Sequence, residues 1–276
     1  MPKENMTRRD FIKKTTKALG GIVVSGEFLE NVKENGLQEK TVKGEIEKCT
    51  QIIRNEQYEK VLGNPYLVST LFYSKEAIQN IKPPHEYPAE EIIVNIYPLI
   101  TKQFREKYIT FLTNLVRDTS LNQENMNMEG LSFPLDNLDW RDAEYNHEDA
   151  LDLFTEEGSP IYSISGGIVV LAENGWRMGD KMSTSSMRGG NTIIIFNPQE
   201  ESFYRYAHLQ KTIIEAGTIL PSGTRIGTVG HTGINASKRG HGGHLHLEMN
   251  RYDRKEGAMT AEHFSEIQKM LKILQG

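Results

Sequence analysis

The sequence contains almost no cysteine. Cys49 is the single cysteine in a chain of 276 residues, which excludes an intrachain disulfide and a zinc site built from several thiolates. A metal bound by this chain must therefore use histidine and carboxylate ligands. Because disulfides are excluded, stability must come from apolar burial, and a hydrophobic content of 37% is enough for one or two domains.

The sequence also lacks an excess of positive charge. Its 32 Lys and Arg residues are outnumbered by 37 Asp and Glu residues, which gives a net charge of -5 and a pI near 6.0. Proteins that bind nucleic acids usually carry a basic patch. We therefore expect no nucleic-acid partner.

Near the N-terminus, the apolar run of residues 18–26 is well below the roughly 20 residues needed to cross a bilayer. It follows Thr7-Arg8-Arg9-Asp10-Phe11-Ile12-Lys13, which resembles a twin-arginine export signal. We predict that residues 1–30 are a twin-arginine-like signal segment and that the protein is exported to the periplasm or cell envelope. The alternative is a basic amphipathic helix in a cytosolic protein. Lys17 abuts the apolar run and no clean A-x-A site follows it, so cleavage stays open.

Residues 36–118 are predicted to be helical. Apolar residues recur from Val42 to Val61 at helical spacing, and Pro65 can open a second helix. A third stretch ends at Asp118 and is expected to kink or divide at Pro98. We expect an ordinary core without chemistry, and a region that covers or regulates a groove or binds a protein partner.

After the polar segment 119–130, the sequence changes to short apolar runs separated by Gly, Asn and Pro. Runs of this length and spacing predict an antiparallel sheet, here over residues 131–255. The long loop 173–190 is expected to form a wall of a groove, and a helix is expected in residues 256–276, starting at Thr260. The predicted fold class is α+β, a helical N-terminal region followed by a mostly antiparallel sheet, with strands at 161–164, 167–171, 192–196, 203–207, 224–229 and 245–249.

Three of the eight histidines lie within the segment His241-Gly-Gly-His244-Leu-His246-Leu-Glu248. In a strand, His244 and His246 share one face, and their side chains start roughly 6.6 Å apart. At that spacing one ring can ligate a metal while the other reaches a water beside it. Taken alone, the pattern favours an ordinary exposed strand in which His and Leu alternate.

Three further elements accompany this strand. A histidine and an aspartate precede a turn that launches a strand, a Y-x-H-L element ends another strand, and a glycine-punctuated turn comes before the His-Leu-His strand. Together they resemble the lysostaphin-type, or LytM-like, zinc peptidoglycan endopeptidases, in the family's order and over Phe133 to Asn250. The elements are His147 and Asp152 before Gly158-Ser159-Pro160-Ile161, then Tyr206-Ala207-His208-Leu209, Gly227-Thr228-Val229-Gly230-His231-Thr232-Gly233 and His244-Leu245-His246.

The resemblance implies one zinc ion held by His147, Asp152 and His246, with a coordination position left for water. Three N and O ligands with an open position are typical of catalytic zinc. His208 and His244 would then be the catalytic histidines. One would exchange protons with water and the leaving amine, while the other stabilises the oxyanion or holds the peptide. The sequence does not divide these roles.

One spacing departs from the family pattern. The family commonly places its first histidine four residues before the aspartate, where this chain has Glu148, and His147 lies one residue earlier. Either His147 or Glu148 is the first ligand. We favour His147, because neutral imidazole is a frequent zinc ligand. Glu248 shares a strand face with the histidines and is expected to orient one of them.

The resemblance implies a zinc-dependent endopeptidase that hydrolyses peptide bonds in peptidoglycan stem or cross-bridge peptides. Two alternatives stay open: a catalytically inactive module that regulates other wall hydrolases, and a zinc peptidase acting on peptides outside the wall. The sequence predicts neither the substrate-binding residues nor the bond cleaved nor the oligomeric state.

Overall fold

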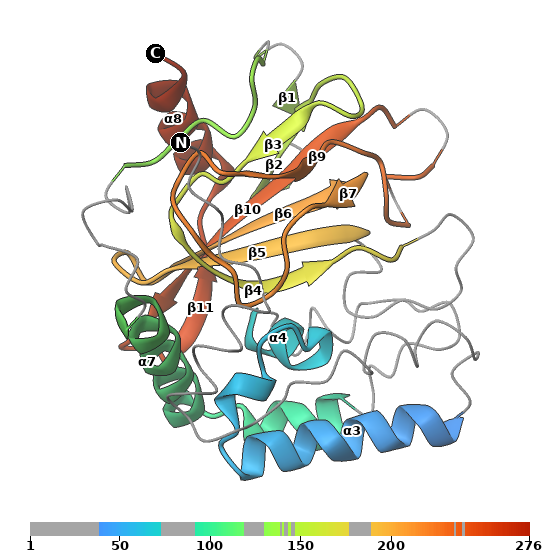
Figure 1. The fold of residues 1–276 in the computed structure, drawn as a ribbon, viewed down its shortest axis with the longest axis vertical. Helices are drawn as coiled ribbons and strands as arrows, with labels where there is room; N and C mark the ends of the chain where they lie inside the picture. The colour runs from blue at the N-terminus through green and yellow to red at the C-terminus, as the bar shows by residue number, and fades with distance from the viewer. Residues whose placement is uncertain are drawn as a thin grey trace, which may run out of the picture.

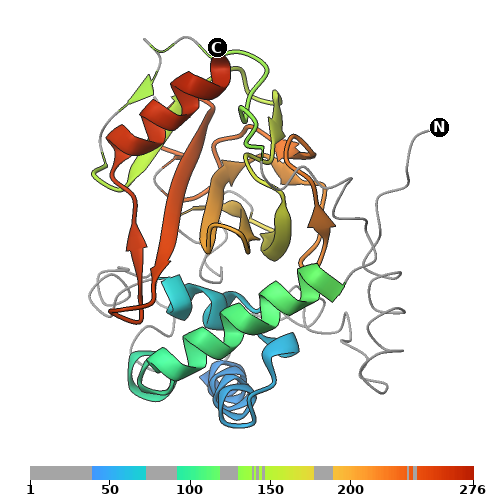
Figure 2. The ribbon, with the colours of Figure 1, turned by 90° about the vertical axis from the view of Figure 1, so that its left-hand side faces the viewer.

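The computed structural model describes residues 39–72, 92–118, 130–138, 140, 143–144, 147–176, 189–234, 236–238 and 241–276. The predicted signal segment and most of the predicted loop 173–190 lie outside these residues. The described chain forms three layers (Figures 1 and 2): helices below, a large sheet in the middle, and a small sheet with the C-terminal helix above. The predicted α+β fold class is confirmed.

The helical elements begin and end as follows. The lower layer holds all except the last, which is the C-terminal helix. They are α3 (Glu39–Arg54), the 3-10 turn η1 (Tyr58–Lys60), α4 (Pro65–Phe72), the π-helical turn η2 (Ile92–Ile96), the 3-10 turn η3 (Tyr97–Leu99), α7 (Lys102–Asp118) and α8 (Phe264–Gln275).

Local sequence explains most of the helix boundaries. Helix α4 begins at Pro65, as predicted, and the Asn64 side chain caps it by accepting a hydrogen bond from the Leu67 N–H at 3.1 Å. Pro98 lies in the short turn before α7, so the predicted interruption there is confirmed. The expectation that the first helix runs on toward Val61 was wrong: α3 ends at Arg54, two residues before a backbone turn with a φ of +51°.

The strands are short and antiparallel. The large sheet has the order β1-β2-β10-β6-β5-β4-β8, with β11 paired to β10, and the small sheet has the order β3-β9-β7. Their bounds are β1 (Ala143–Glu144), β2 (Ala150–Phe154), β3 (Pro160–Tyr162), β4 (Gly167–Glu173), β5 (Asn191–Asn197), β6 (Ser202–Leu209), β7 (Lys211–Thr212), β8 (Ile219–Leu220), β9 (Arg225–Thr228), β10 (His244–Asp253) and β11 (Ala258–Ala261).

All six predicted strands are present, but two features of the sheet differ from the prediction. Strand β2, which carries Asp152, was not predicted as a strand. Thr260 was expected to start the last helix, yet it lies in β11 and pairs with Arg251 of β10. The helix begins at Phe264 instead, after His263 accepts a hydrogen bond from the Ser265 N–H and caps it.

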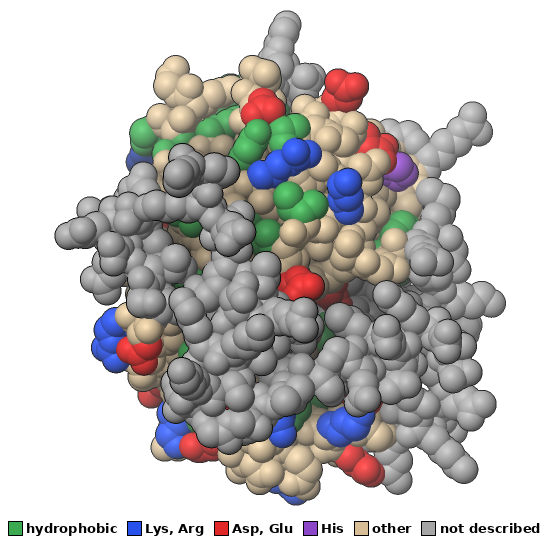
Figure 3. Space-filling model, viewed as in Figure 1, with side chains coloured by type: hydrophobic (Ala, Val, Ile, Leu, Met, Phe, Trp, Pro, Cys, Tyr) green, Lys and Arg blue, Asp and Glu red, His purple; other side chains and the backbone are tan. Residues whose placement is uncertain are grey.

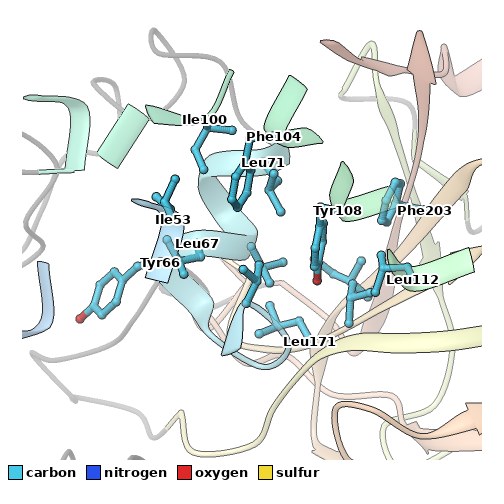
Figure 4. Packing of buried hydrophobic residues seen from close by; sticks show 14 of the residues in the cluster. Ile53, Tyr66, Leu67, Leu71, Ile100, Phe104, Tyr108, Leu112, Leu171 and Phe203 are labelled. Atoms are coloured by element: carbon cyan, nitrogen blue, oxygen red, sulfur yellow. The ribbon is translucent and has the colours of Figure 1, made fainter. Parts of the chain in front are cut away.

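Both faces of the large sheet are buried, each by a different layer. The lower face packs against α4 and α7, and α3 joins the same hydrophobic cluster through the turns η1, η2 and η3. In this cluster Phe72 meets Phe203 edge-on at a centroid distance of 4.7 Å. Figure 4 shows Leu67 and Leu71 of α4 turned toward this cluster. The upper face packs against α8 and the small sheet. Side chains alternate along a strand, so Leu245 and Leu247 enter the upper cluster while His244 and His246 face the helical side.

The predicted division of the chain at residues 119–130 stays a prediction, because residues 119–129 lie outside the described residues. Among the described helices, none has the length and apolar content that crossing a bilayer requires. On the face seen in Figure 3, Lys and Arg side chains are interspersed with Asp and Glu side chains over the described residues.

Candidate metal centre

Two neighbouring strands bring an aspartate and a histidine together. In the antiparallel pair of β2 and β10, His246 lies directly opposite Asp152. Leu151 and Leu153 on either side of Asp152 are fully buried in the upper cluster, so the carboxylate points to the helical side, where His246 also points. His246 Nδ1 and Asp152 Oδ1 are 2.6 Å apart. The pairing register of β2 and β10 therefore places Asp152 and His246 side by side.

His147 completes the group from the segment that leads into β2. Its Nε2 lies 3.7 Å from Asp152 Oδ2, and its side chain is 48% exposed. His147, Asp152 and His246 each offer a ligand atom, and these atoms lie within 4.8 Å of one another. Glu148 is exposed and does not belong to this group in the described part of the chain. Of the two open alternatives, the geometry favours His147.

The other ring nitrogen of His246, Nε2, is hydrogen-bonded to Glu248. Glu248 lies two residues further along β10 on the same face, and its Oε1 is 3.0 Å from His246 Nε2. A carboxylate accepts, so the imidazole donates from Nε2. Glu248 in turn forms an ion pair with Arg205, which lies directly opposite on β6. Both side chains are largely buried, at 10% exposed for Arg205 and 16% for Glu248.

This chain of charges perturbs the acid–base behaviour of each member. Burial raises the pKa of Glu248, but the Arg205 charge and the hydrogen bond to His246 outweigh it and lower that pKa to about 2. Burial lowers the pKa of His246, but hydrogen bonds to Asp152 and Glu248 outweigh it and raise that pKa to about 9. Burial also raises the pKa of Asp152, but the hydrogen bond to His246 and the charge of that ring outweigh burial, so the pKa of Asp152 is lowered. The protein thus keeps both carboxylates ionised next to a histidine.

The two remaining predicted histidines face the same centre. His208 is the next-to-last residue of β6, and His244 is the first residue of β10. The centroid of the His208 ring lies 4.8 Å from that of His244 and 5.3 Å from that of His246. Phe154 stacks on His244 at 4.8 Å. All five predicted site residues therefore lie in one cluster.

Backbone carbonyls fix the tautomers of His208 and His244. Nδ1 of His208 lies 2.7 Å from the Thr232 carbonyl oxygen, and Nδ1 of His244 lies 2.9 Å from that of Gly242. A carbonyl oxygen only accepts, so each Nδ1 carries a proton and each neutral ring keeps a lone pair on Nε2. Burial, the largest cause, lowers the pKa of His208 to about 3 and also lowers that of His244. Both rings are neutral at pH 7 and are suited to accept a proton through Nε2.

The donor set suits zinc. Imidazole nitrogen and carboxylate oxygen bind zinc at about 2.0–2.2 Å, and His147, Asp152 and His246 present such atoms close enough to converge on one ion after small side-chain rotations. Asp152 and His246 are buried while His147 is half-exposed. One side of the group is therefore open, as a catalytic zinc site requires.

Sequence reasoning missed Arg205 and the contact of Thr232 with His208. Arg205 lies between Tyr204 and Tyr206, whose side chains enter the upper cluster. Because side chains alternate along a strand, this pattern predicts that Arg205 lies on the histidine face. Its partner on β10 depends on strand register, which the sequence does not reveal. Thr232 stands in the glycine-punctuated turn that sequence analysis singled out, but no pattern assigns it a contact.

Residues 146–258 match the family model of peptidase family M23. No curated protein matches the sequence. Solved structures with a similar fold include lysostaphin from Staphylococcus simulans, which is 21% identical over 52% of this chain and 55% of that chain, with a TM-score of 0.37. A protein described as a putative glycyl-glycine endopeptidase lytM, from Ruminococcus gnavus, is 16% identical over 70% of this chain and 84% of that chain, with a TM-score of 0.34.

A structure described as a zinc-containing peptidase from Vibrio cholerae is 22% identical over 44% of this chain and 36% of that chain, with a TM-score of 0.33. This chain thus spans about half of lysostaphin and about a third of the Vibrio protein.

Proposed function

The chain carries a domain of peptidase family M23 over residues 146–258, and on that premise we propose that it is a zinc-dependent endopeptidase of peptidoglycan. The proposed substrates are stem or cross-bridge peptides, and the reaction is hydrolysis of a peptide bond. One observation carries the proposal: His147, Asp152 and His246 offer three metal-ligand atoms within 4.8 Å of one another, next to two neutral histidines.

In this proposal, His147, Asp152 and His246 hold a single zinc ion. When bound, zinc supplies Lewis-acid polarisation of the scissile carbonyl and lowers the pKa of water beside it. Glu248 accepts the Nε2 proton of His246, which leaves Nδ1 of that ring for the metal.

His208 and His244 carry the proton transfers jointly. Each presents an unprotonated Nε2, because its Nδ1–H is held by a backbone carbonyl. One ring takes a proton from the attacking water and later donates it to the leaving amine. The other, once protonated or bonded to water, stabilises the developing oxyanion or holds the peptide.

The test compares purified sacculi with unrelated polypeptides as substrates for zinc-loaded protein. We expect new amino groups to be released from sacculi, and D152A and H246A to lose both zinc and activity. H208A and H244A should lose turnover with zinc retained. Zinc retention in D152A and H246A would overturn the ligand assignment. Cleavage of polypeptides but not of sacculi would overturn the substrate, and stoichiometric zinc without any cleavage would favour an inactive regulatory module.

The proposed substrate lies outside the cytoplasm, so we also propose that the chain is exported and that residues 1–30 direct it. The twin-arginine-like Arg8 and Arg9 support this. Replacing both by Lys should retain the protein in the cytoplasm, measured by cell fractionation. Export that is unchanged by this replacement would contradict the signal assignment.

A further inference from the structure

We propose that Thr232 is a positioning residue: its hydroxyl anchors the backbone carbonyl that holds His208 in the tautomer needed for proton transfer. The inference rests on the proposed function only for its turnover measurement. The contact itself is a feature of the structure.

His208 sits in an unusual backbone conformation. Its φ is +63°, in the left-handed region that residues other than glycine enter infrequently. Such a conformation persists only where neighbouring groups hold it in place. The position therefore needs external support, and the side chain it carries is one of the two proposed proton carriers.

The supporting groups come from two neighbouring segments. The His208 N–H donates to the Gly189 carbonyl oxygen at 2.7 Å, from the chain that leads into β5. On the other side, the His208 Nδ1–H donates to the Thr232 carbonyl oxygen at 2.7 Å, and the Thr232 N–H lies 3.4 Å from the His208 carbonyl oxygen. Thr232 thus contacts both the ring and the backbone of His208.

The Thr232 hydroxyl fixes that contact in place. It donates to the Leu209 carbonyl oxygen at 2.8 Å and accepts from the Asn191 N–H at 2.9 Å. A hydroxyl can donate and accept at one atom in this way. The hydroxyl therefore ties the turn before β10 to the start of β5 and to the end of β6, one residue beyond His208.

The backbone at Thr232 lies close against Gly190. A Cβ added at Gly190 would lie 2.3 Å from both the Thr232 carbonyl carbon and its hydroxyl oxygen. The two backbones approach so closely that only glycine fits, and Gly190 itself has a φ of +63°. If the hydroxyl bonds are lost, the carbonyl that orients His208 loses its anchor.

The experiment compares T232V, which keeps the shape without the hydroxyl, with T232S, which keeps the hydroxyl. Zinc-loaded protein labelled with ¹⁵N-histidine reports the His208 tautomer by NMR, with the signals assigned through their loss in H208A. The matched control is T228V, which removes a buried hydroxyl that donates to the Gln210 side chain at 3.3 Å.

We expect wild-type protein, T232S and T228V to show His208 protonated at Nδ1, and T232V to show a mixture of tautomers. With zinc content unchanged, kcat of T232V should fall about 10- to 100-fold with KM little changed, and T232S should restore it. A wild-type His208 protonated at Nε2 overturns the proposal, even if T232V does not fold. Wild-type behaviour of T232V, or equal impairment of T232S, also overturns it. Wild-type protein that cleaves no sacculus overturns the proposed function instead, and the tautomer measurement still decides this inference.

Discussion

Replacing Glu248 by Gln tests whether the ion pair behind His246 tunes the metal centre. The carboxylate of Glu248 lies 3.0 Å from His246 Nε2 and pairs with Arg205, and both charged side chains are at most 16% exposed. Gln keeps the volume and a hydrogen-bond acceptor but removes the negative charge. His246 then becomes a less basic ligand, and Arg205 is left beside a neutral amide.

Two magnitudes follow. Removing a hydrogen-bond partner of a metal-bound histidine typically weakens metal binding 10- to 100-fold, which corresponds to about 1.4–2.7 kcal/mol. Removing one charge of a buried ion pair destabilises a fold by about 3–5 kcal/mol. We expect E248Q to fall in the lower part of that range, because its amide still fills the site and can still hydrogen-bond.

Zinc affinity is measured by competition with a chromophoric chelator, and stability by urea unfolding of the metal-free protein. The matched control is E262Q, which removes the same charge from a partly exposed pair with Arg251, 3.5 Å apart. Its zinc affinity should not change, and its stability should change by less than about 1 kcal/mol. Wild-type zinc affinity in E248Q would refute the reasoning that Glu248 tunes His246.

Three further predictions concern the ligands and the core. H147A should lose stoichiometric zinc while E148A retains it, as measured by metal analysis, and the reverse result would reinstate Glu148 as the ligand. Because the pKa of His246 in the metal-free protein is raised to about 9, that ring is charged at pH 7, so zinc binding should release about one proton there and fewer above pH 9. Titration calorimetry in two buffers measures this release, and no release at pH 7 would contradict the assignment. L67A removes a fully buried side chain from the helical layer and should cost about 2–5 kcal/mol in urea unfolding, whereas I273A, at a position 72% exposed, should cost less than about 0.5 kcal/mol.

Much of the sheet could be predicted because apolar runs and turn residues mark its strands. Strand β2 was not predicted, although the alternation of Leu151, Asp152 and Leu153 is typical of a strand with one buried face. The sequence analysis also did not predict that the helices and the sheet share one hydrophobic core, although one strand indicates it. Strand β5 contains four consecutive apolar residues, Ile193 to Phe196, which indicates burial on both faces.

The five candidate site residues came from motif order, and the structure brings all five together. What the sequence could not provide is strand register. Arg205 meets Glu248 only because β6 and β10 pair with these residues opposite each other, and a shift of one residue would turn Arg205 to the other face. The choice between His147 and Glu148 likewise depended on the path of the chain into β2, which spacing alone does not determine.

The helices and the histidines occupy the same face of one sheet, with Phe203 covered by Phe72 and Arg205 two positions further along β6. A shortened version of the protein that begins at the sheet would leave Ile168, Ile194 and Phe203 exposed on the same face as the histidine cluster. Such a fragment would be prone to aggregate through that surface, and a loss of activity in it would say nothing about whether the helices recognise substrate. Questions about these helices are better put to point substitutions than to deletions.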